Sequence, residues 1–452
     1  MSCFSTAFAL VVVAVGGAIS PAMFAADWPQ FQGPERSGIS PETGLARSWP
    51  EGGPKVLWTV DVGEGFAAAA IRDGKVHVLD RSPNGKDVLR CLDLGTGQEE
   101  WTCAYDAPGK LQYPGSRQVP TVDEKLIFAM GPFGNFNCID RATHQIVWSH
   151  HMVNDFKDPA VDNAADDPTD RAALLARTRV PTWGFTQAPA LYKDTVIVAP
   201  QTRNVGLVAY EKTTGKLRWT SPYVGRNWYD HVSPYVTTLC GVDQVIMIGQ
   251  PGDPEKWPPA IISGVDAGTG KMLWQMRTWH SYKIPISSPV RIGEDRLFVS
   301  GAYGIGCFML KIGREAGRWT TDYVFKDNKN SAAQIQNPIY YRDDIYVQSC
   351  NEPGAGNNGL TCLDTSGEIK WRTGPKQVFG SGGLLIADGL IYVMDGNTGE
   401  LNLFEARPDE CRQLATARVL AAEGRLVWAP LALSDGKLVV RDQHQMKCLL
   451  VK

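Results

Sequence analysis

The sequence predicts an all-β protein: an eight-bladed β-propeller of four-stranded antiparallel blades, in which the N-terminal strand pairs into the last blade and closes the ring. Three observations lead to this prediction. A short strand pattern recurs eight times, a turn followed by a tryptophan strand recurs in most repeats, and each chain end holds part of one repeat. A fixed period of about 40–50 residues is typical of propellers and other repeat architectures.

The short strands set the period. Each one follows a polar or glycine residue, and the second and fourth residues after that position are apolar, which is the alternation of a β-strand. Neighbouring positions lie 46 to 52 residues apart, except for one gap of 70. The eight positions are Gly74, Glu124, Asp194, Asp243, Asp295, Asp343, Gly389 and Gly436. The longer gap predicts a loop insertion at about residues 153–180, and its charged composition favours a solvated surface loop.

The hairpin from Gly264 to Trp274 is the clearest copy of the second marker. The carboxylate of Asp266 can accept backbone N–H bonds across the turn, and Gly270 can adopt a positive φ without a Cβ clash. We expect one tryptophan per blade to dock on the neighbouring blade, with full burial worth on the order of a few kcal/mol each. The predicted docking residues are Trp58, Trp101, Trp148, Trp219, Trp274 and Trp371, and Trp319 is expected to serve the fifth blade.

Cysteines recur just before the turn in four of the repeats. These residues are Cys91, Cys138, Cys362 and Cys448. Because a thiol is small and behaves as an apolar group in a protein interior, we expect them to be packing residues rather than reactive ones.

The two chain ends complete each other. The last repeat holds the strands that begin at Gly436 and Met446 but no tryptophan strand, whereas residues 56–62 form a tryptophan strand with no preceding turn. An open array would leave both ends as exposed strand edges, which proteins avoid, so a closed ring is predicted. We therefore predict one propeller domain at residues 56–452, preceded by an N-terminal extension at residues 27–55.

Residues 1–26 are predicted to be a signal peptide. The apolar run from Ala7 to Ile19 is too short to span a bilayer, and the small residues near Ala26 suit cleavage. Cys3 precedes the apolar run, so it does not stand where a lipid-accepting cysteine would. We expect an exported protein, periplasmic or extracellular, with no transmembrane segment. The formal net charge of −3 gives no basis for a nucleic-acid partner.

The repeated Asp-x-x-Thr-Gly-x-x-x-x-Trp unit resembles the tryptophan-docking motif of the PQQ-like (quinoprotein-type) β-propellers, where PQQ is pyrroloquinoline quinone. That family includes quinoprotein alcohol dehydrogenases and BamB-type outer-membrane assembly factors. The segment at residues 27–40 resembles the start of exported PQQ-binding-like repeat proteins. The resemblance implies the fold over nearly the whole mature chain. The adjacent cysteine pair typical of the dehydrogenases is absent, no calcium-binding set is recognisable, and the lipid-bearing cysteine of the BamB type is missing.

The loops that enter the innermost strands are expected to converge at one mouth of the central channel. Aromatic and polar groups gathered there suit a small-molecule or peptide site. A guanidinium such as that of Arg117 pairs with carboxylates, and an indole stacks on flat rings. The predicted ligand-binding residues are Arg117, Trp183, Tyr229, His231, Lys283, Gln336 and Trp428. The alternative, in which these residues only pack and hydrogen-bond the mouth shut, stays open. No catalytic set and no metal motif is recognised.

These observations favour an exported envelope binding or scaffold propeller of the BamB-like type, which holds an envelope protein, a peptide or a small-molecule ligand at the channel mouth or the blade loops. Whether the protein is an enzyme stays open. One alternative is a diverged PQQ-dependent quinoprotein alcohol or sugar dehydrogenase, with PQQ and Ca²⁺ as cofactors. A second alternative is a carbohydrate-binding propeller, which the aromatic mouth suggests.

Overall fold

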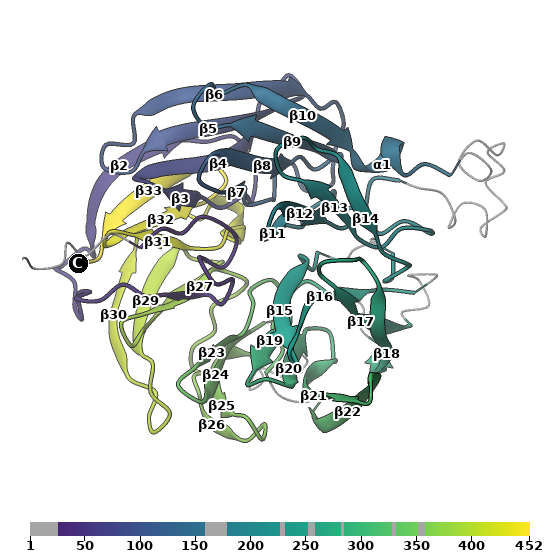
Figure 1. Cartoon of the computed structure of the whole chain (residues 1–452). Coiled ribbons are helices and arrows are strands. Elements are labelled where there is room, and N and C mark those ends of the chain that lie inside the picture. The colour runs from purple at the N-terminus through teal and green to yellow at the C-terminus, as the bar shows by residue number, and fades with distance from the viewer. Residues whose placement is uncertain are drawn as a thin grey trace, which may run out of the picture.

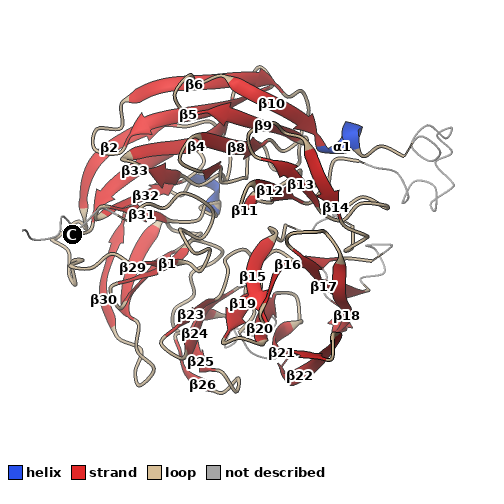
Figure 2. Ribbon diagram, in the orientation of Figure 1, coloured by secondary structure: helices blue, strands red, loops and turns tan. Residues whose placement is uncertain are grey.

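The computed structural model describes residues 26–158, 179–226, 231–251, 258–281, 284–327, 331–350 and 358–452. These residues form eight four-stranded antiparallel sheets arranged around a common centre (Figures 1 and 2), which confirms the predicted eight-bladed β-propeller. The predicted signal peptide lies almost entirely outside the described residues, as do residues 159–178 of the predicted insertion. Among the described residues, no helix is long and apolar enough to cross a membrane.

The first four blades follow one another in chain order, and each begins with its innermost strand. The first contains β3 (Ala70–Arg72), β4 (Lys75–Arg81), β5 (Lys86–Asp93) and β6 (Glu99–Asp106). The second contains β7 (Thr121–Val122), β8 (Leu126–Met130), β9 (Asn135–Asp140) and β10 (Ile146–His151), which leads into the short helix α1 (Met152–Asp155). The third contains β11 (Ala190–Tyr192), β12 (Thr195–Val198), β13 (Val208–Glu211) and β14 (Leu217–Thr220). The fourth contains β15 (Tyr235–Leu239), β16 (Val242–Gly249), β17 (Pro259–Asp266) and β18 (Met272–Ser281).

The remaining blades repeat this order. The fifth contains β19 (Val290–Ile292), β20 (Arg296–Gly301), β21 (Gly306–Glu315) and β22 (Arg318–Asp327). The sixth contains β23 (Ile339–Tyr341), β24 (Asp344–Ser349), β25 (Gly359–Asp364) and β26 (Ile369–Arg372). The seventh contains β27 (Leu384–Ala387), β28 (Leu390–Met394), β29 (Glu400–Glu405) and β30 (Gln413–Arg418), followed by the 3₁₀ turn η3 (Glu423–Arg425). The eighth contains β31 (Ala432–Ser434), β32 (Lys437–Arg441) and β33 (Gln445–Leu450).

The N-terminal strand β2 (Lys55–Asp61) completes the eighth blade. It pairs antiparallel with β33, and Trp58 stands opposite Cys448 in the register. This pairing confirms the predicted ring closure and removes the two sheet edges that the chain ends would otherwise expose.

Indole rings connect neighbouring blades through the Thr-Gly turns. The ring of Trp58 lies so close to Gly97 that a Cβ there would meet it at 2.7 Å, and its Nε1 donates a hydrogen bond of 2.8 Å to the carbonyl oxygen of Leu94. Trp148 of the second blade repeats both contacts on the third blade, against Gly215 and the carbonyl of Lys212. At these two contacts the indole ring lies where the Cβ of any residue other than glycine would stand.

The turns themselves are held by their acidic residue, as expected. Oδ1 of Asp266 accepts hydrogen bonds from the backbone N–H of Thr269 at 2.8 Å and from its hydroxyl at 2.8 Å. Asp140 accepts the equivalent bonds from Thr143, and the backbone bond is the main reason that the pKa of Asp140 lies below its usual value.

The fifth blade differs from the expectation. Phe325, not Trp319, packs on the neighbouring turn, where a Cβ at Gly367 would lie 2.7 Å from the phenyl ring. Phe325 pairs with Met309 beside a β-bulge, in the same way that Trp371 pairs with Cys362 beside a bulge. The fifth hairpin has ten-residue strands, so Trp319 lies near its tip, beyond the docking position.

The four repeated cysteines are buried behind the docking rings. Cys91, Cys138, Cys362 and Cys448 are fully or almost fully buried, and none of them forms a disulfide. Burial raises the pKa of each of these thiols to about 12. The thiols are therefore protonated at neutral pH and act as the small packing groups that the repeat pattern predicts.

The N-terminal extension runs into the centre of the ring. Trp28 exchanges two backbone hydrogen bonds with Ile71, and the carbonyl of Pro29 accepts a bond from the N–H of Val122. Further along, β1 (Ile39–Ser40) pairs parallel with β27 and adds a fifth strand to the inner edge of the seventh blade. Figure 1 shows this purple segment crossing the middle of the molecule before it reaches the outer strand β2. The extension thus occupies part of the central channel.

Candidate ligand site at the channel mouth

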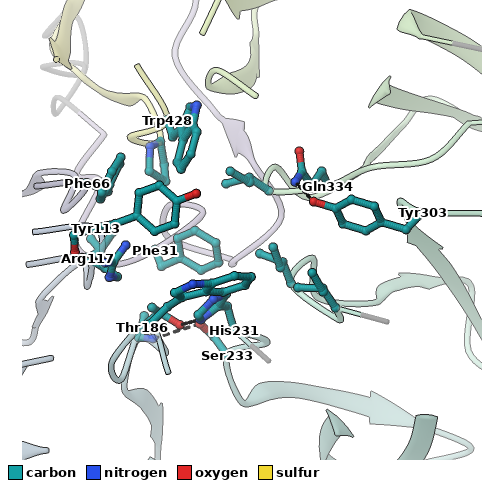
Figure 3. A pocket seen from close by; sticks show the side chains of 17 residues that line it. Phe31, Phe66, Tyr113, Arg117, Thr186, His231, Ser233, Tyr303, Gln334 and Trp428 are labelled. Atoms are coloured by element: carbon teal, nitrogen blue, oxygen red, sulfur yellow. Dashed lines mark hydrogen bonds between the residues drawn. The ribbon is translucent and has the colours of Figure 1, made fainter. Parts of the chain in front are cut away.

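A cavity of about 230 Å³ lies at the end of the channel where the loops enter the innermost strands. Its walls come from the loops before the inner strands of seven blades, all but the seventh, and its two remaining side chains are Phe31 of the N-terminal segment and Tyr303 (Figure 3). The lining residues are Phe31, Phe66, Tyr113, Arg117, Val119, Trp183, Thr186, Ala188, His231, Ser233, Ile284, Ile286, Tyr303, Gln334, Ile335, Trp428 and Pro430. We call this cavity the mouth pocket.

Aromatic rings form one wall of the mouth pocket. Phe66 stacks on Trp428 with ring centroids 5.1 Å apart and planes 21° apart. Tyr113 lies tilted against Trp428 at 5.7 Å and edge-on to Trp183 at 6.3 Å. Because these rings pack on one another, the wall is ordered before any ligand arrives, which lowers the entropic cost of binding a flat apolar group.

Arg117 brings a positive charge into this apolar wall. Its guanidinium carbon lies 5.1 Å from the ring centre of Phe66 and 5.9 Å from that of Tyr113, and one of its N–H groups donates to the carbonyl oxygen of Tyr113. Its Nε is buried without an acceptor, and no carboxylate of the described residues forms an ion pair with it. Burial lowers the pKa of Arg117 to about 10, so the group stays charged at neutral pH. A desolvated cation of this kind gains from an anionic ligand.

His231 lies beside this charge and is itself neutral. Its ring stacks on Trp183 at 5.5 Å, its Nδ1 shares a hydrogen bond with the hydroxyl of Thr186, and its backbone N–H donates to the carbonyl of Pro285 at 2.8 Å. Burial, and then the charge of Arg117, lower the pKa of His231 to about 3. At neutral pH the imidazole therefore offers hydrogen bonding and a flat face rather than a second positive charge.

The structure brings four of the predicted ligand-binding residues into one cavity: Arg117, Trp183, His231 and Trp428. Gln336 lies behind the cavity, with 3% of its surface exposed, and its Nε2 donates to the carbonyl of Trp428 at 3.1 Å. It supports the loop that carries Trp428 and does not line the cavity. Tyr229 and Lys283 lie outside the described residues.

Several lining residues were not predicted from the sequence. Phe66 precedes the inner strand of the first blade, so the same repeat rule that selected Arg117 would have found it. Phe31 comes from the N-terminal segment, which carries no repeat signal. Tyr303 lies between β20 and β21, and its hydroxyl accepts a 2.5 Å hydrogen bond from Nε2 of Gln334. Only the fold brings these last residues to the mouth.

The mouth pocket does not fit a calcium-loaded quinone. Its rings and Arg117 suit a flat anion, but none of its 17 lining residues is an aspartate or glutamate. Protein sites for Ca²⁺ are built from several oxygen ligands, with carboxylates prominent among them. Among the described residues, no cluster of three or more His, Cys, Asp or Glu side chains is placed to hold a metal ion anywhere in the chain.

Comparison with known proteins agrees with the fold. The family model described as outer membrane protein assembly factor BamB matches residues 85–335 and 258–446. A quinohemoprotein alcohol dehydrogenase from Pseudomonas putida HK5 is similar in structure, with 14% identity, coverage of 94% of this chain and 80% of that chain, and a TM-score of 0.60. A europium-containing methanol dehydrogenase aligns with 12% identity over 92% of this chain and 89% of that chain, with a TM-score of 0.63.

The assembly factor BamB from Moraxella catarrhalis aligns with 13% identity over 88% of this chain and 99% of that chain, with a TM-score of 0.56. No curated protein matches the chain in sequence. At these identities the solved structures show a shared fold and not a shared activity. The two family matches together extend from residue 85 to residue 446, and the chain therefore belongs to the PQQ-like β-propeller repeat family described by the BamB model.

Proposed function

We propose that the protein is an exported envelope binding protein whose mouth pocket holds a flat apolar group that carries a carboxylate. The observation that carries this proposal is the position of Arg117, a partly buried cation in a cage of aromatic rings that forms no ion pair with a carboxylate of the described residues. The flat group can belong to a small molecule or to the C-terminal end of a peptide that finishes in an aromatic residue, since both present the same chemistry.

Each part of such a ligand has a counterpart in the pocket. The carboxylate would pair with the guanidinium of Arg117, and charge-assisted hydrogen bonds of this kind contribute about 1.5–3 kcal/mol. The ring would pack on Trp428 and Trp183, where an aromatic pair adds about 0.5–1.5 kcal/mol beyond its buried area. The apolar side chains of Ile284 and Ile286 would exclude water from the ion pair.

The cellular location in this proposal is the periplasm or the outside of the cell. It is supported by the predicted signal peptide at residues 1–26 and by the description of the matching family, which names outer-membrane assembly. A role as a scaffold for an envelope protein would use the same mouth, with a peptide segment of the partner in place of the small molecule.

Calorimetry on the mature chain tests this proposal. We expect 2-naphthoate to bind and 2-naphthalenemethanol, which has the same ring and no charge, to bind at least about tenfold more weakly, because the charge-assisted bonds would be lost. Arg117→Gln should weaken naphthoate by about 10- to 100-fold and leave the neutral analogue unchanged. A dipeptide ending in tryptophan distinguishes a peptide ligand from a free small molecule. Equal affinity for naphthoate in wild type and Arg117→Gln would overturn the proposal.

The quinoprotein alternative is tested with the same protein. Loading with PQQ and Ca²⁺ should produce no dye reduction with alcohols or sugars if the protein is a binding module. Dye reduction that depends on both additions would instead make it a diverged dehydrogenase. Neutral sugars in the calorimeter test the carbohydrate-binding alternative, which requires heat of binding that Arg117→Gln does not abolish.

A further inference from the structure

The N-terminal segment separates the mouth pocket from a second, larger cavity. Phe31 lines the mouth pocket, and the residues that follow it, Gln32 and then Glu35 to Ser37, line a cavity of about 530 Å³. The inner strands show which end of the channel it occupies. In the third blade Ala188, before β11, lines the mouth pocket, whereas Tyr192, at the end of β11, lines the second cavity. The second cavity therefore faces the opposite end of the channel.

We propose that this second cavity binds an acidic sugar of the uronic acid class, a small hydroxyl-rich ring with one carboxylate. Its volume lies within the range of small-molecule sites, about 300–1,000 Å³. Its lining is mainly polar, in contrast to the apolar walls of the mouth pocket. It combines the half-buried guanidinium of Arg36 and the exposed one of Arg291 with three tyrosine rings and several amide and hydroxyl groups.

Arg36 supplies the group that would recognise the carboxylate. One of its guanidinium nitrogens, Nη1, donates to the carbonyl oxygen of Pro189 at 3.0 Å and to Oε1 of Gln30 at 3.4 Å. Among the described residues, its Nε and Nη2 have no acceptor and no carboxylate forms an ion pair with it. Burial lowers the pKa of Arg36 to about 10, which leaves a desolvated positive charge at neutral pH. A planar guanidinium with two open nitrogens matches the two oxygens of a carboxylate.

The backbone holds Arg36 in this position at a conformational cost. Its φ is +53°, and that of Gln32 in the same segment is +64°, although neither residue is a glycine. Such conformations are unfavourable by roughly 1–3 kcal/mol each and persist where the surrounding structure imposes them. Here the surrounding contacts are the backbone bonds of Trp28 and Pro29 and the pairing of β1 with β27.

The rest of the lining suits a sugar ring better than an aromatic or aliphatic acid. Tyr192, Tyr235 and Tyr340 line the cavity, and an aromatic ring offers a surface on which the C–H face of a sugar can pack. Gln32 also lines the cavity, is 4% exposed, and its Oε1 is buried without a hydrogen-bond partner among the described residues. An acid without hydroxyl groups would form fewer hydrogen bonds with the polar side chains of this lining, each of which contributes about 0.5–1.5 kcal/mol.

The acidic residues of the cavity define its selectivity further. Asp243 already accepts hydrogen bonds from Tyr192 at 2.9 Å and from Thr238 at 2.7 Å, so its charge is well satisfied. Glu35 is exposed and makes no ion pair with a described residue, so it faces an incoming carboxylate as a like charge. We therefore expect Glu35→Gln to strengthen the binding of a uronate, which a purely structural role of this loop would not cause.

Calorimetry with three probes on the mature protein tests this proposal. D-galacturonate carries both the carboxylate and the hydroxyls, D-galactose carries only the hydroxyls, and acetate carries only the carboxylate. We expect D-galacturonate to bind and the other two to bind at least about tenfold more weakly, since each lacks one set of contacts. Equal affinity for D-galacturonate and D-galactose, or no binding of D-galacturonate, would overturn it.

Variants locate the site. Arg36→Gln should weaken D-galacturonate by about 10- to 100-fold, Glu35→Gln should strengthen it two- to fivefold, and Arg117→Gln, in the mouth pocket, should leave it unchanged. Arg36→Lys keeps the charge but not the planar fork, so it serves if Arg36→Gln fails to fold, and it should weaken binding by about threefold or more. Loss of D-galacturonate binding in Arg117→Gln would place the sugar in the mouth pocket and contradict the proposal.

Discussion

The imidazole of His144 lies flat on the indole of Trp101, with ring centroids 4.4 Å apart and planes 13° apart. His144 occupies the turn position that Gly97 and Gly215 occupy in other blades, and it adopts their left-handed conformation, with φ of +62°. In the second blade a stacked ring therefore replaces the glycine against which an indole docks elsewhere.

This stack predicts an unusual order of stabilities at position 144. His144→Ala removes the stacked ring and keeps a strained φ, so it should lower the free energy of unfolding by about 1–2 kcal/mol. His144→Gly removes the ring but also the strain, so it should be less destabilising than alanine. Thermal unfolding of the three proteins checks the order, and an alanine variant as stable as wild type would show that the stack contributes nothing.

The docking glycines predict a matched pair of substitutions. Gly97 and Gly74 both have a positive φ, +72° and +70°, but a Cβ on Gly97 meets the ring of Trp58 at 2.7 Å, whereas a Cβ on Gly74 meets nothing within 4 Å. Gly74→Ala should therefore cost only the backbone strain, about 1 kcal/mol. Gly97→Ala should cost about 1–3 kcal/mol more, because it also displaces the indole. Urea unfolding of both variants gives the difference, and equal losses would mean that the turn tolerates the clash.

The fifth blade predicts that a phenylalanine carries the docking contact. Phe325→Ala should lower stability by about 2–4 kcal/mol, because it opens a space beside Gly367. Trp319→Ala, near the tip of the same hairpin, should have a clearly smaller effect. The melting temperatures of the two variants test this directly, and a larger loss for Trp319→Ala would restore the tryptophan as the docking residue.

The buried histidine His77 predicts how the stability of the fold responds to acid. The side chain of His77 is 2% exposed, and its Nε2 lies 3.7 Å from Sγ of Cys91. Burial lowers the pKa of His77 from 6.5 to about 3. The unfolded chain therefore binds a proton at this residue between pH 6.5 and pH 3 while the folded chain does not, so stability falls as the pH is lowered through that window. His77→Gln should flatten the melting temperature over this range. Parallel pH profiles of variant and wild type would contradict the assignment.

The hydrogen bond from Gln336 to the loop of Trp428 predicts an indirect effect on ligand binding in the mouth pocket. Gln336 donates a hydrogen bond of 3.1 Å to the backbone carbonyl of Trp428 and is not itself one of the residues that line the pocket. Gln336→Leu should weaken 2-naphthoate by roughly three- to tenfold through the lost bond, about 0.5–1.5 kcal/mol. The weakening should be the same for 2-naphthalenemethanol, because the contact with Arg117 is intact. A loss confined to the charged ligand would mean that Gln336 acts on the ion pair instead.

Local sequence patterns determined the architecture of this protein. The alternation in each short strand, the acidic turn residue and the recurring tryptophan act over fewer than 15 residues, and they specify one blade. Repetition then implies the ring, because an open array would expose two strand edges. The repeat rule also selected Arg117, Trp183, His231 and Trp428, since the same position in every blade leads to the same mouth.

Only the tertiary structure decided the features that lie outside the repeat pattern. The N-terminal segment lies outside the period, so nothing in its sequence states that β1 pairs with β27, more than 340 residues away, or that Phe31 and Arg36 line two different cavities. The docking role of Phe325 depends on hairpin length and register, which place a ring relative to its neighbour in space and not along the chain. The surroundings of Arg117 and Arg36 are likewise a property of the assembled ring: they desolvate both guanidinium groups and lower the pKa of each to about 10.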